Sequence, residues 1–303
     1  MDRQRRIQKE IRDLFENKLE DNGIYYELDN DNINIIKVMM IGTKNTPYEN
    51  GFFFFTIKFP QNYPFVPLKV WYYTTNPHMR FNPNLYNNGK VCLSIINTWG
   101  RTDNWTESMG VKSVLLSIQS MVLTEEPLRN EPGLPVSKES IDSYNSVVKY
   151  CVFNIAIHEV LTKEFQRKME NNQSDITISF DNFKPIIREY FIKNINWYLR
   201  RTKELHLNFN NKIVKFNKPF AQYRFICNYN YLLDEFTKIY TDLTNKEIDN
   251  IKISLNNIDL SKMNINNLKK ICRENKFKGY SKKRKLDIIN LINEKIENNK
   301  III

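Results

Sequence analysis

Residues Arg80–Ser94, which read RFNPNLYNNGKVCLS, place a single cysteine directly after a polar, turn-forming segment. The Asn-Gly pair at positions 88 and 89 predicts a tight turn, because both residue types tolerate positive φ. Cys92 follows this turn, between two apolar neighbours. A cysteine beside a polar turn can be partly exposed and act as a nucleophile. The alternative is that Cys92 is a small hydrophobic residue of the core.

Three motifs occur in order around this cysteine. Tyr63–Pro67 reads YPFVP, Leu115–Ser120 reads LLSIQS, and Asn84 precedes Cys92 by eight residues. In this order and at these gaps, the motifs resemble those of the ubiquitin-conjugating enzymes, in which the asparagine of a His-Pro-Asn tripeptide precedes the nucleophilic cysteine by the same distance. The resemblance extends over residues 1–160. Asn82 stands where most of that family has histidine.

A narrower resemblance comes from the segments that flank the same motifs. RFNPN, GKVCLS, a delayed tryptophan and NEPG are together similar to the large conjugating enzymes that load two modifiers, ubiquitin and the tandem modifier FAT-ten. That subtype shares the asparagine in place of histidine and carries a helical C-terminal extension. The resemblance therefore implies an enzyme that needs no cofactor of its own. ATP would be consumed by the activating enzyme that delivers the modifier.

The resemblance also implies roles for the residues around the cysteine. The Cys92 thiolate would accept ubiquitin or a ubiquitin-like modifier as a thioester and pass it to a substrate lysine or to a ubiquitin ligase. The Asn84 amide would stabilise the oxyanion of this transfer, or Asn84 would hold the loop through backbone hydrogen bonds; both roles are compatible. Asn82 would have a structural role in the turn. Many relatives have an acidic residue beside the cysteine, and Asn130 and Glu131 are the candidates for that place.

Contacts with partner proteins follow from the same resemblance. Phe65, bracketed by prolines that restrict the backbone, would bind a ligase or else pack as a staple between strands. Trp105 aligns with the second ligase-binding loop of the family, although Thr-Glu follows it where Ser-Pro is usual. Arg5, Arg6 and Lys9 in the first helix would contact the activating enzyme, and the alternative is a solvated basic face.

Hydrophobic periodicity predicts an α+β fold, similar to that of the ubiquitin-conjugating enzymes, with an antiparallel four-stranded sheet and packed helices. The apolar stripe of Arg3–Lys18 predicts an amphipathic helix that packs across the sheet. Val111–Thr124 is expected to form a core helix behind the cysteine. Runs of β-branched and aromatic residues predict the strands, which are Tyr25–Leu28, Ile33–Ile41, Phe52–Phe59 and Lys69–Thr74.

Three domains are expected: a catalytic domain at residues 1–160, a helical extension at 161–244, and a basic helical module at 258–296. The polar, Asn-rich stretch 245–257 is interpreted as a linker. The extension would pack against the catalytic domain or would select the modifier or the ligase. Further helices are predicted at Ser140–Met169, Asn182–Leu199 and Tyr223–Leu243.

The C-terminal segment Leu260–Ile292 resembles the SAP-type module, in which an extended segment joins two helices. Residues 252–303 contain 13 basic and 5 acidic residues, a net charge of +8 out of +11 for the whole chain. Such a tail favours a polyanion or an acidic partner. Binding of DNA phosphates without base readout is predicted, through Lys278, Lys282, Lys283 and Arg284. The alternative is a solvated basic helix pair.

Composition limits the other functional classes. The chain has 303 residues, 41% of them hydrophobic, which is enough for one large domain and an appendage. No apolar run reaches about 18 residues and the N-terminus MDRQRRIQKE lacks a signal core, so we expect an intracellular protein, cytoplasmic or nuclear, without membrane contact. The four cysteines form no CxxC pair, which predicts no metal site and no disulfide framework. The alternative to an enzyme is a catalytically silent ubiquitin- or nucleic-acid-binding scaffold, and Cys92 argues against it.

Overall fold

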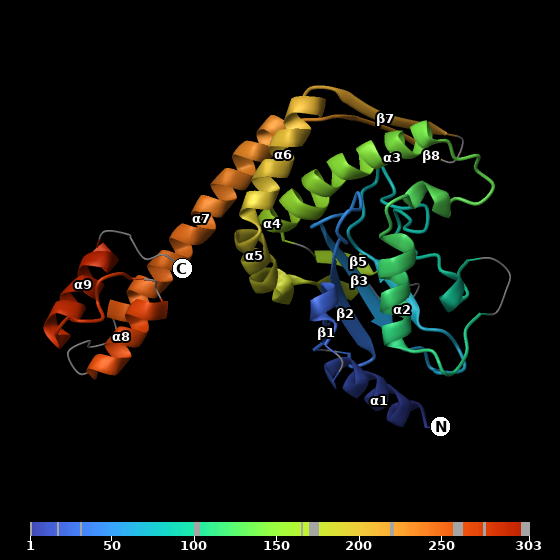
Figure 1. Ribbon diagram of the computed structural model, residues 1–303. Coiled ribbons are helices and arrows are strands. Elements are labelled where there is room, and N and C mark those ends of the chain that lie inside the picture. The colour runs from blue at the N-terminus through green and yellow to red at the C-terminus, as the bar shows by residue number, and fades with distance from the viewer. Residues whose placement is uncertain are drawn as a thin grey trace. The chain divides into compact units, whose positions relative to one another are not determined.

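The structure, a computed structural model, describes residues 2–16, 18–30, 32–99, 104–164, 166–169, 176–218, 221–256, 263–274 and 277–297. Figure 1 shows the helices and strands along the chain. The chain divides into two compact units, Met1–Phe236 and Thr237–Ile303, and each is described by itself. Within the described residues, no helix has both the length and the apolar character needed to cross a membrane.

A four-stranded antiparallel sheet forms the centre of the first unit (Figure 1). Met39 pairs with Phe54 across the two central strands, and nearly every residue of these strands is buried. The predicted α+β fold and its four strands are confirmed, with strand ends that differ by one or two residues. In chain order, which is also the order in the sheet, the strands are β1 (Ile24–Leu28), β2 (Ile35–Ile41), β3 (Phe52–Lys58) and β4 (Lys69–Tyr72).

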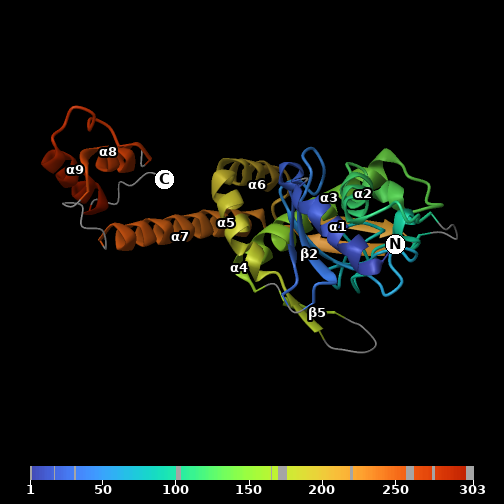
Figure 2. The same ribbon diagram turned by 90° about the horizontal axis from the view of Figure 1, so that it is seen from below.

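Two helices, α1 (Arg3–Glu16) and α2 (Val111–Ser117), contact each other beside this sheet (Figure 2). The apolar stripe of α1 buries Ile7 and Leu14, as its periodicity predicts. The helix predicted at Val111–Thr124 is present and continues from α2 as a π-helical segment, Ile118–Val122. Short 3-10 turns lie at Glu20–Asn22, Ser94–Ile96 and Pro127–Asn130.

The later part of the first unit covers one face of the sheet. Phe54 of β3 and Phe180 pack with their ring centroids 4.8 Å apart. The Tyr198 hydroxyl donates to the Asn50 carbonyl at 2.9 Å, at the start of β3. The extension therefore packs against the sheet. The buried cluster at this contact comprises Met39, Ile41, Phe52, Phe54, Tyr73, Val160, Ile178, Phe180, Phe183 and Ile187.

The extension contains helices and two β-hairpins. The helix that leads toward the extension is capped by Ser137, whose hydroxyl accepts the Ser140 N–H at 3.2 Å. The elements in order are α3 (Lys138–Cys151), a π-helical segment (Val152–Glu159), α4 (Val160–Thr162), β5 (Gln166–Met169), β6 (Ile176–Ser179), a 3-10 turn (Asp181–Phe183), α5 (Lys184–Lys193), α6 (Ile195–Phe209), β7 (Ile213–Lys218), β8 (Ala221–Ile226) and α7 (Tyr229–Asn256).

Some of the helix predictions for this region are wrong in part. The end of the predicted helix Ser140–Met169 is strand β5, and the start of the predicted helix Tyr223–Leu243 lies in β8. Aromatic and β-branched residues suit both a helix stripe and a short strand, so periodicity alone does not separate the two. The helix expected at Asn182–Leu199 is two helices that meet at Asn194.

The linker expected at residues 245–257 is also a wrong prediction, since α7 continues through this stretch to Asn256. Residue 257 lies outside the described residues. Polar, Asn-rich composition predicted a linker, but asparagine only weakly disfavours a helix.

In the second unit, α8 (Ile265–Glu274) and α9 (Lys285–Glu297) follow the end of α7. The Lys269 ammonium donates to the Ser281 carbonyl at 2.8 Å and ties the intervening turn to α8. The two helices expected here are present, and a turn lies between them where the sequence predicts an extended segment; residues 258–262 and 275–276 of the predicted module lie outside the described residues. The core consists of Leu268, Cys272, Phe277, Ile288 and Ile292.

Candidate active site

The segment around Cys92 folds as a narrow antiparallel loop. The Cys92 N–H donates to the Asn84 carbonyl at 2.9 Å. Gly89, at the tip, has a φ of +89°, and a Cβ there would lie 2.8 Å from the Tyr72 carbonyl oxygen. Both the backbone conformation and this close approach require glycine. The predicted Asn-Gly turn is confirmed, and it places Asn84 opposite Cys92.

The buried side chain of Asn82 holds this loop. Its Nδ2 donates to the Val122 carbonyl at 2.9 Å. Its Oδ1 accepts the Asn84 N–H at 2.8 Å and the Nδ2 of Asn130 at 3.3 Å. Asn130 also donates to the Met121 carbonyl at 2.8 Å. These contacts are those that the expected structural role of Asn82 requires, and they make Asn130 part of the same support.

The Asn84 side chain takes no part in this support. Only 9% of the residue is exposed, and its Oδ1 is buried without a hydrogen-bond partner among the described residues. A buried unpaired oxygen costs about 1–3 kcal/mol, so such atoms are uncommon in native structures. The backbone of Asn84 holds the loop, and its amide side chain is left uncommitted.

Thr98 supports the chain on both sides of Cys92. Its hydroxyl donates to the Val91 carbonyl at 2.8 Å and accepts the Leu93 N–H at 2.9 Å. Cys92 itself is 2% exposed. A cavity of about 310 Å³ lies between the segment 66–71 and residues of the segment 90–98, and Cys92 is not among the residues that line it. Sequence analysis missed Thr98, because a threonine five residues after a leucine carries no motif.

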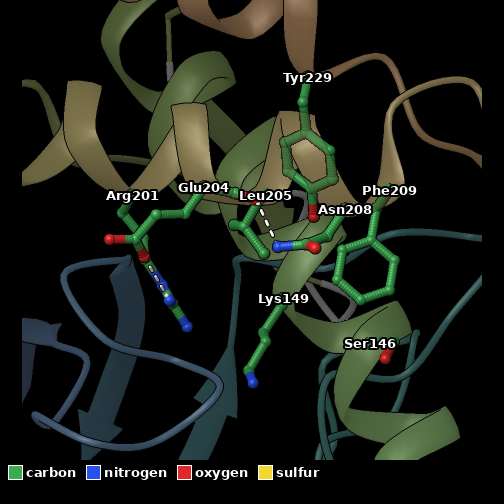
Figure 3. Close-up of a pocket in the computed structure, with 8 residues that line it drawn as sticks. All are labelled: Ser146, Lys149, Arg201, Glu204, Leu205, Asn208, Phe209 and Tyr229. Atoms are coloured by element: carbon green, nitrogen blue, oxygen red, sulfur yellow. Dashed lines mark hydrogen bonds and ion pairs between the residues drawn. The ribbon is translucent and has the colours of Figure 1, made fainter.

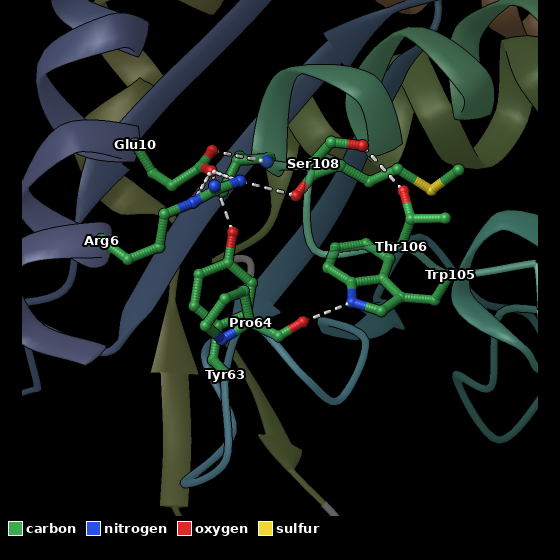
Figure 4. Close-up of polar contacts among 9 residues, drawn as sticks. Arg6, Glu10, Tyr63, Pro64, Trp105, Thr106 and Ser108 are labelled. Carbon is green, nitrogen blue, oxygen red and sulfur yellow. Dashed lines mark hydrogen bonds and ion pairs between the residues drawn. The ribbon is translucent and has the colours of Figure 1, made fainter. Parts of the chain in front are cut away.

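Phe65 and Trp105, the two predicted ligase contacts, differ in exposure. Phe65 is 64% exposed, whereas Trp105 is 9% exposed. The Trp105 Nε1 donates to the Pro64 carbonyl at 2.7 Å, and its ring lies 6.1 Å from that of Tyr63 (Figure 4). A buried indole leaves little surface for a partner. The structure therefore favours a supporting role for Trp105, which holds the loop that presents Phe65.

Arg6 takes part in a polar network at the start of the chain (Figure 4). Its guanidinium pairs with the Glu10 carboxylate at 2.7 Å and donates to the Met109 carbonyl at 2.9 Å. Arg5 and Lys9, the other two residues predicted to meet the activating enzyme, are exposed. Arg6 is thus held by its own chain, and Arg5 and Lys9 are the residues with surface for a partner.

Two residues that the sequence analysis did not single out lie near the cysteine. The Arg80 guanidinium carbon is 3.9 Å from the centroid of the Tyr86 ring. Burial, and then hydrogen bonding and charge interaction with Cys92, raise the pKa of Tyr86, and Arg80 opposes this effect. Burial also raises the pKa of Tyr223; Arg80 opposes this effect, and Cys151 and Glu131 add to it. The Tyr223 hydroxyl accepts the Arg80 N–H at 3.1 Å.

A second cavity, of about 330 Å³, is lined by α3, α6 and the start of α7 (Figure 3). Burial, followed by repulsion from Arg201, lowers the pKa of Lys149 in its wall. Arg201 pairs with Glu204 at 2.8 Å. None of the residues that line this cavity belongs to the loop of Cys92, so the cavity is separate from the candidate active site.

The basic residues predicted to bind nucleic acid are exposed around the turn between α8 and α9. The Arg284 Nε lies 3.8 Å from the Oδ2 of Asp287, in the first turn of α9. No group of three or more His, Cys, Asp or Glu side chains is arranged to hold a metal ion in the part of the chain that the structure describes.

Comparison with known proteins identifies the class of protein to which this fold and the loop of Cys92 belong. Residues 6–152 match the family model described as ubiquitin-conjugating enzyme. The chain is 32% identical over 245 residues to "Ubiquitin-conjugating enzyme E2 Z" of Xenopus tropicalis, covering 80% of this chain and 72% of that protein. The chain therefore belongs to the ubiquitin-conjugating enzyme family, and the prediction of a transferase is confirmed.

Other relatives share shorter segments. The chain is 41% identical over 174 residues to "Probable ubiquitin-conjugating enzyme protein 17" of Caenorhabditis elegans, covering 54% of this chain and 24% of that protein. It is 38% identical over 159 residues to the human E2 Z, covering 52% of this chain and 44% of that protein. A solved ubiquitin-conjugating enzyme of Plasmodium falciparum is 31% identical, covers 39% of this chain and 96% of its own, and aligns with a TM-score of 0.34.

Proposed function

We propose that Cys92 accepts ubiquitin or a ubiquitin-like modifier from an activating enzyme and transfers it to a substrate lysine or to a ligase. The Cys92 thiolate attacks the thioester carbonyl on the activating enzyme, a new C–S bond forms, and the activating enzyme's thiolate leaves. A neutral lysine amine then attacks the Cys92 thioester. An isopeptide bond forms, the Cys92 thiolate leaves, and the amine proton passes to a base or to water. The placement of Cys92 opposite Asn84 in a loop of the family's motif carries this proposal.

The uncommitted amide of Asn84 supports an oxyanion role for that residue. Attack on a thioester places negative charge on the carbonyl oxygen, and a positioned amide N–H stabilises this charge. Asn82 holds the loop with its side chain, whereas Asn84 contributes only its backbone to the loop. The two roles expected for Asn84 are thus divided between the backbone and side chain of one residue.

Exposed residues support the proposed contacts with partners. Phe65 presents most of its ring to solvent, which fits a ligase contact. Arg5 and Lys9 are exposed on α1, which fits a charged contact with the activating enzyme. Trp105 and Arg6 would act indirectly, by holding the segments that carry these residues.

A charging assay tests the reaction. The protein is mixed with ATP, ubiquitin and an activating enzyme, and the product is resolved without reductant. We expect a species heavier by one modifier that disappears with thiol reductant and is absent in Cys92→Ala but present in the control Cys272→Ala. If ubiquitin and the tandem modifier, each with its competent activating enzyme, give no such species, the scaffold alternative replaces this proposal.

Asn84→Ala separates charging from transfer. The variant should still form the thioester, but discharge to free lysine should be about 100-fold slower, the usual effect of removing an oxyanion donor. Discharge at the wild-type rate would contradict the oxyanion role while leaving the role of Cys92 intact.

A second function, binding of nucleic acid by the C-terminal module, rests on the exposed basic turn. Four basic residues on one turn would contact phosphates with little base discrimination. Replacement of Lys278, Lys282, Lys283 and Arg284 by Gln in the full chain should weaken DNA binding and reduce its salt dependence. The same replacement of Lys112, Lys138, Lys203 and Lys212, which are exposed elsewhere, is the control. Equal loss in both variants would show only a general charge effect.

A further inference from the structure

Tyr86 lies on the same side of the active-site loop as Cys92. Leu85 pairs with Val91 across the loop, and the Tyr86 N–H donates to the Lys90 carbonyl at 3.0 Å. Side chains alternate along paired extended segments, so the even-numbered positions of the loop share one face. Tyr86 and Cys92 are therefore diagonal neighbours, a separation that an aromatic side chain can span.

Cationic side chains surround the Tyr86 ring. The Arg80 guanidinium carbon is 3.9 Å from the ring centroid, and the Lys90 ammonium nitrogen is 5.6 Å from it. Stacking of a guanidinium on an aromatic ring is favourable and restricts the orientation of the ring. Burial, and then hydrogen bonding and charge interaction with Cys92, raise the pKa of Tyr86, so the phenol keeps its proton and can act as a hydrogen-bond donor; Arg80 opposes this effect.

The backbone of Arg80 is held on both sides by tyrosines, Tyr223 from the extension and Tyr144 from α3, which precedes the extension in the chain. Its N–H donates to the Tyr223 hydroxyl of β8 at 3.1 Å, and its carbonyl accepts the Tyr144 hydroxyl of α3 at 2.9 Å. Phe216 of β7 packs against both tyrosines, with ring centroids 5.0 Å from Tyr144 and 6.1 Å from Tyr223. Burial raises the pKa of Tyr223; the charge of Arg80 lowers it, whereas Cys151 and Glu131 raise it. Arg80 thus has a defined backbone position that depends on elements far along the chain.

We propose that Arg80 is a positioning residue for Cys92: the β7–β8 hairpin and α3 hold its backbone, and its guanidinium keeps the Tyr86 phenol turned toward the thiol. A hydrogen-bond donor and a nearby cation both favour a thiolate over a thiol. The extension would therefore help to prepare the nucleophile as well as cover the sheet. This inference rests on the role proposed for Cys92. It describes the state of the cysteine before any modifier is attached.

The pH dependence of Cys92 alkylation tests the inference without any modifier. The full chain is treated with iodoacetamide over a range of pH, and the peptide that contains Cys92 is quantified by mass spectrometry. Arg80→Gln should move the midpoint upward by about one pH unit and slow alkylation near neutral pH by up to about tenfold. Tyr86→Phe, which removes only a hydroxyl, should act in the same direction. Tyr223→Phe should give a smaller upward shift.

The matched control is Tyr198→Phe. Like Tyr223, Tyr198 is a buried tyrosine of the extension whose hydroxyl is hydrogen-bonded to the backbone, but it donates to the carbonyl of Asn50 rather than accepting the N–H of Arg80. Loss of the Tyr198 hydroxyl should leave the pH midpoint of Cys92 alkylation unchanged. An unchanged midpoint in Arg80→Gln and Tyr86→Phe, or an equal shift in Tyr198→Phe and Tyr223→Phe, would overturn the inference. If Arg80→Gln fails to fold, Tyr86→Phe decides the outcome.

The alkylation assay also separates this inference from the conjugation proposal. A protein that shows the expected midpoint shifts but never charges would retain the positioning role and lose the proposed reaction. A protein that charges normally while Arg80→Gln and Tyr86→Phe leave the midpoint unchanged would retain the reaction and lose the positioning role.

Discussion

The carboxylate of Glu10 in α1 accepts the backbone N–H of Val111 at 3.0 Å and so caps the first turn of α2 from another helix. The same carboxylate accepts the Tyr63 hydroxyl at 3.0 Å and pairs with Arg6 (Figure 4). The first N–H groups of a helix have no partner within it, and negative charge is favourable there. One buried side chain therefore joins α1, α2 and the loop that presents Phe65.

Glu10→Ala should lower the free energy of unfolding by about 3 kcal/mol, because Arg6 and the start of α2 lose a shared buried partner. Urea denaturation measures the change. Glu16→Ala, an exposed glutamate on the same helix, should change it by less than about 0.5 kcal/mol. Equal effects of the two substitutions would show that the cap does not stabilise the fold.

Gly110→Ala should be destabilising through the same carboxylate. A Cβ at Gly110 would lie 2.2 Å from Oε2 of Glu10. The expected cost is about 1–3 kcal/mol, typical of an overpacked site. In a Glu10→Ala background most of this cost should vanish, because the clashing atoms are gone. Additive effects in a double-mutant cycle would contradict the prediction.

Asn82→Ala and Asn84→Ala should differ in stability although the residues are two positions apart. Loss of the Asn82 side chain leaves the Val122 carbonyl and the Asn84 N–H without their partner, at a cost of about 2 kcal/mol or more. Loss of the Asn84 side chain removes a buried oxygen that has no described partner, so its cost should be near zero. Thermal unfolding of both variants measures the difference, and the reverse order would contradict the division of roles.

Phe65→Ala and Trp105→Ala should affect different properties. Phe65 is exposed, so its loss should leave both stability and charging unchanged but reduce transfer that a ligase stimulates. Trp105 is buried and bonded to the Pro64 carbonyl, so its loss should cost about 3–5 kcal/mol. Denaturation and ligase-dependent turnover are measured on both variants. A Phe65→Ala variant with full ligase response would remove Phe65 from the proposed interface.

The free energy of unfolding should decrease in alkaline solution, because the Cys227 thiol ionises more readily in the unfolded chain. Burial raises the pKa of Cys227 from 9.0 to about 11. Between these two values the folded chain keeps a proton that the unfolded chain releases, so the free energy of unfolding decreases as pH rises. Cys227→Ala should make this decrease shallower. Val214→Ala, which removes a neighbouring buried side chain that does not titrate, should leave the slope unchanged. An unaltered slope in Cys227→Ala would contradict the prediction.

Part of the site could be predicted because its signals are local. The strands at residues 24–72 could be predicted from their runs of β-branched and aromatic residues. The Asn-Gly pair predicts its own turn, because both residue types tolerate positive φ. The eight-residue interval between Asn84 and Cys92 supported the resemblance to the family, but only the structure shows that the two residues lie opposite each other. The hairpins at β5–β6 and β7–β8 were mistaken in part for helices, because short apolar runs fit both periods.

The amino-acid sequence by itself determined the sheet, the turn that precedes Cys92 and the resemblance to the family, because each rests on short motifs or runs of residues that are local in the chain. The tertiary structure decided the rest. Glu10 caps a helix about one hundred residues away, Trp105 supports Phe65 from the interior, and Tyr223 holds Arg80 beside the active-site loop. Such contacts depend on which buried polar groups meet when the chain closes, and hydrogen bonds between distant segments leave no pattern in the sequence.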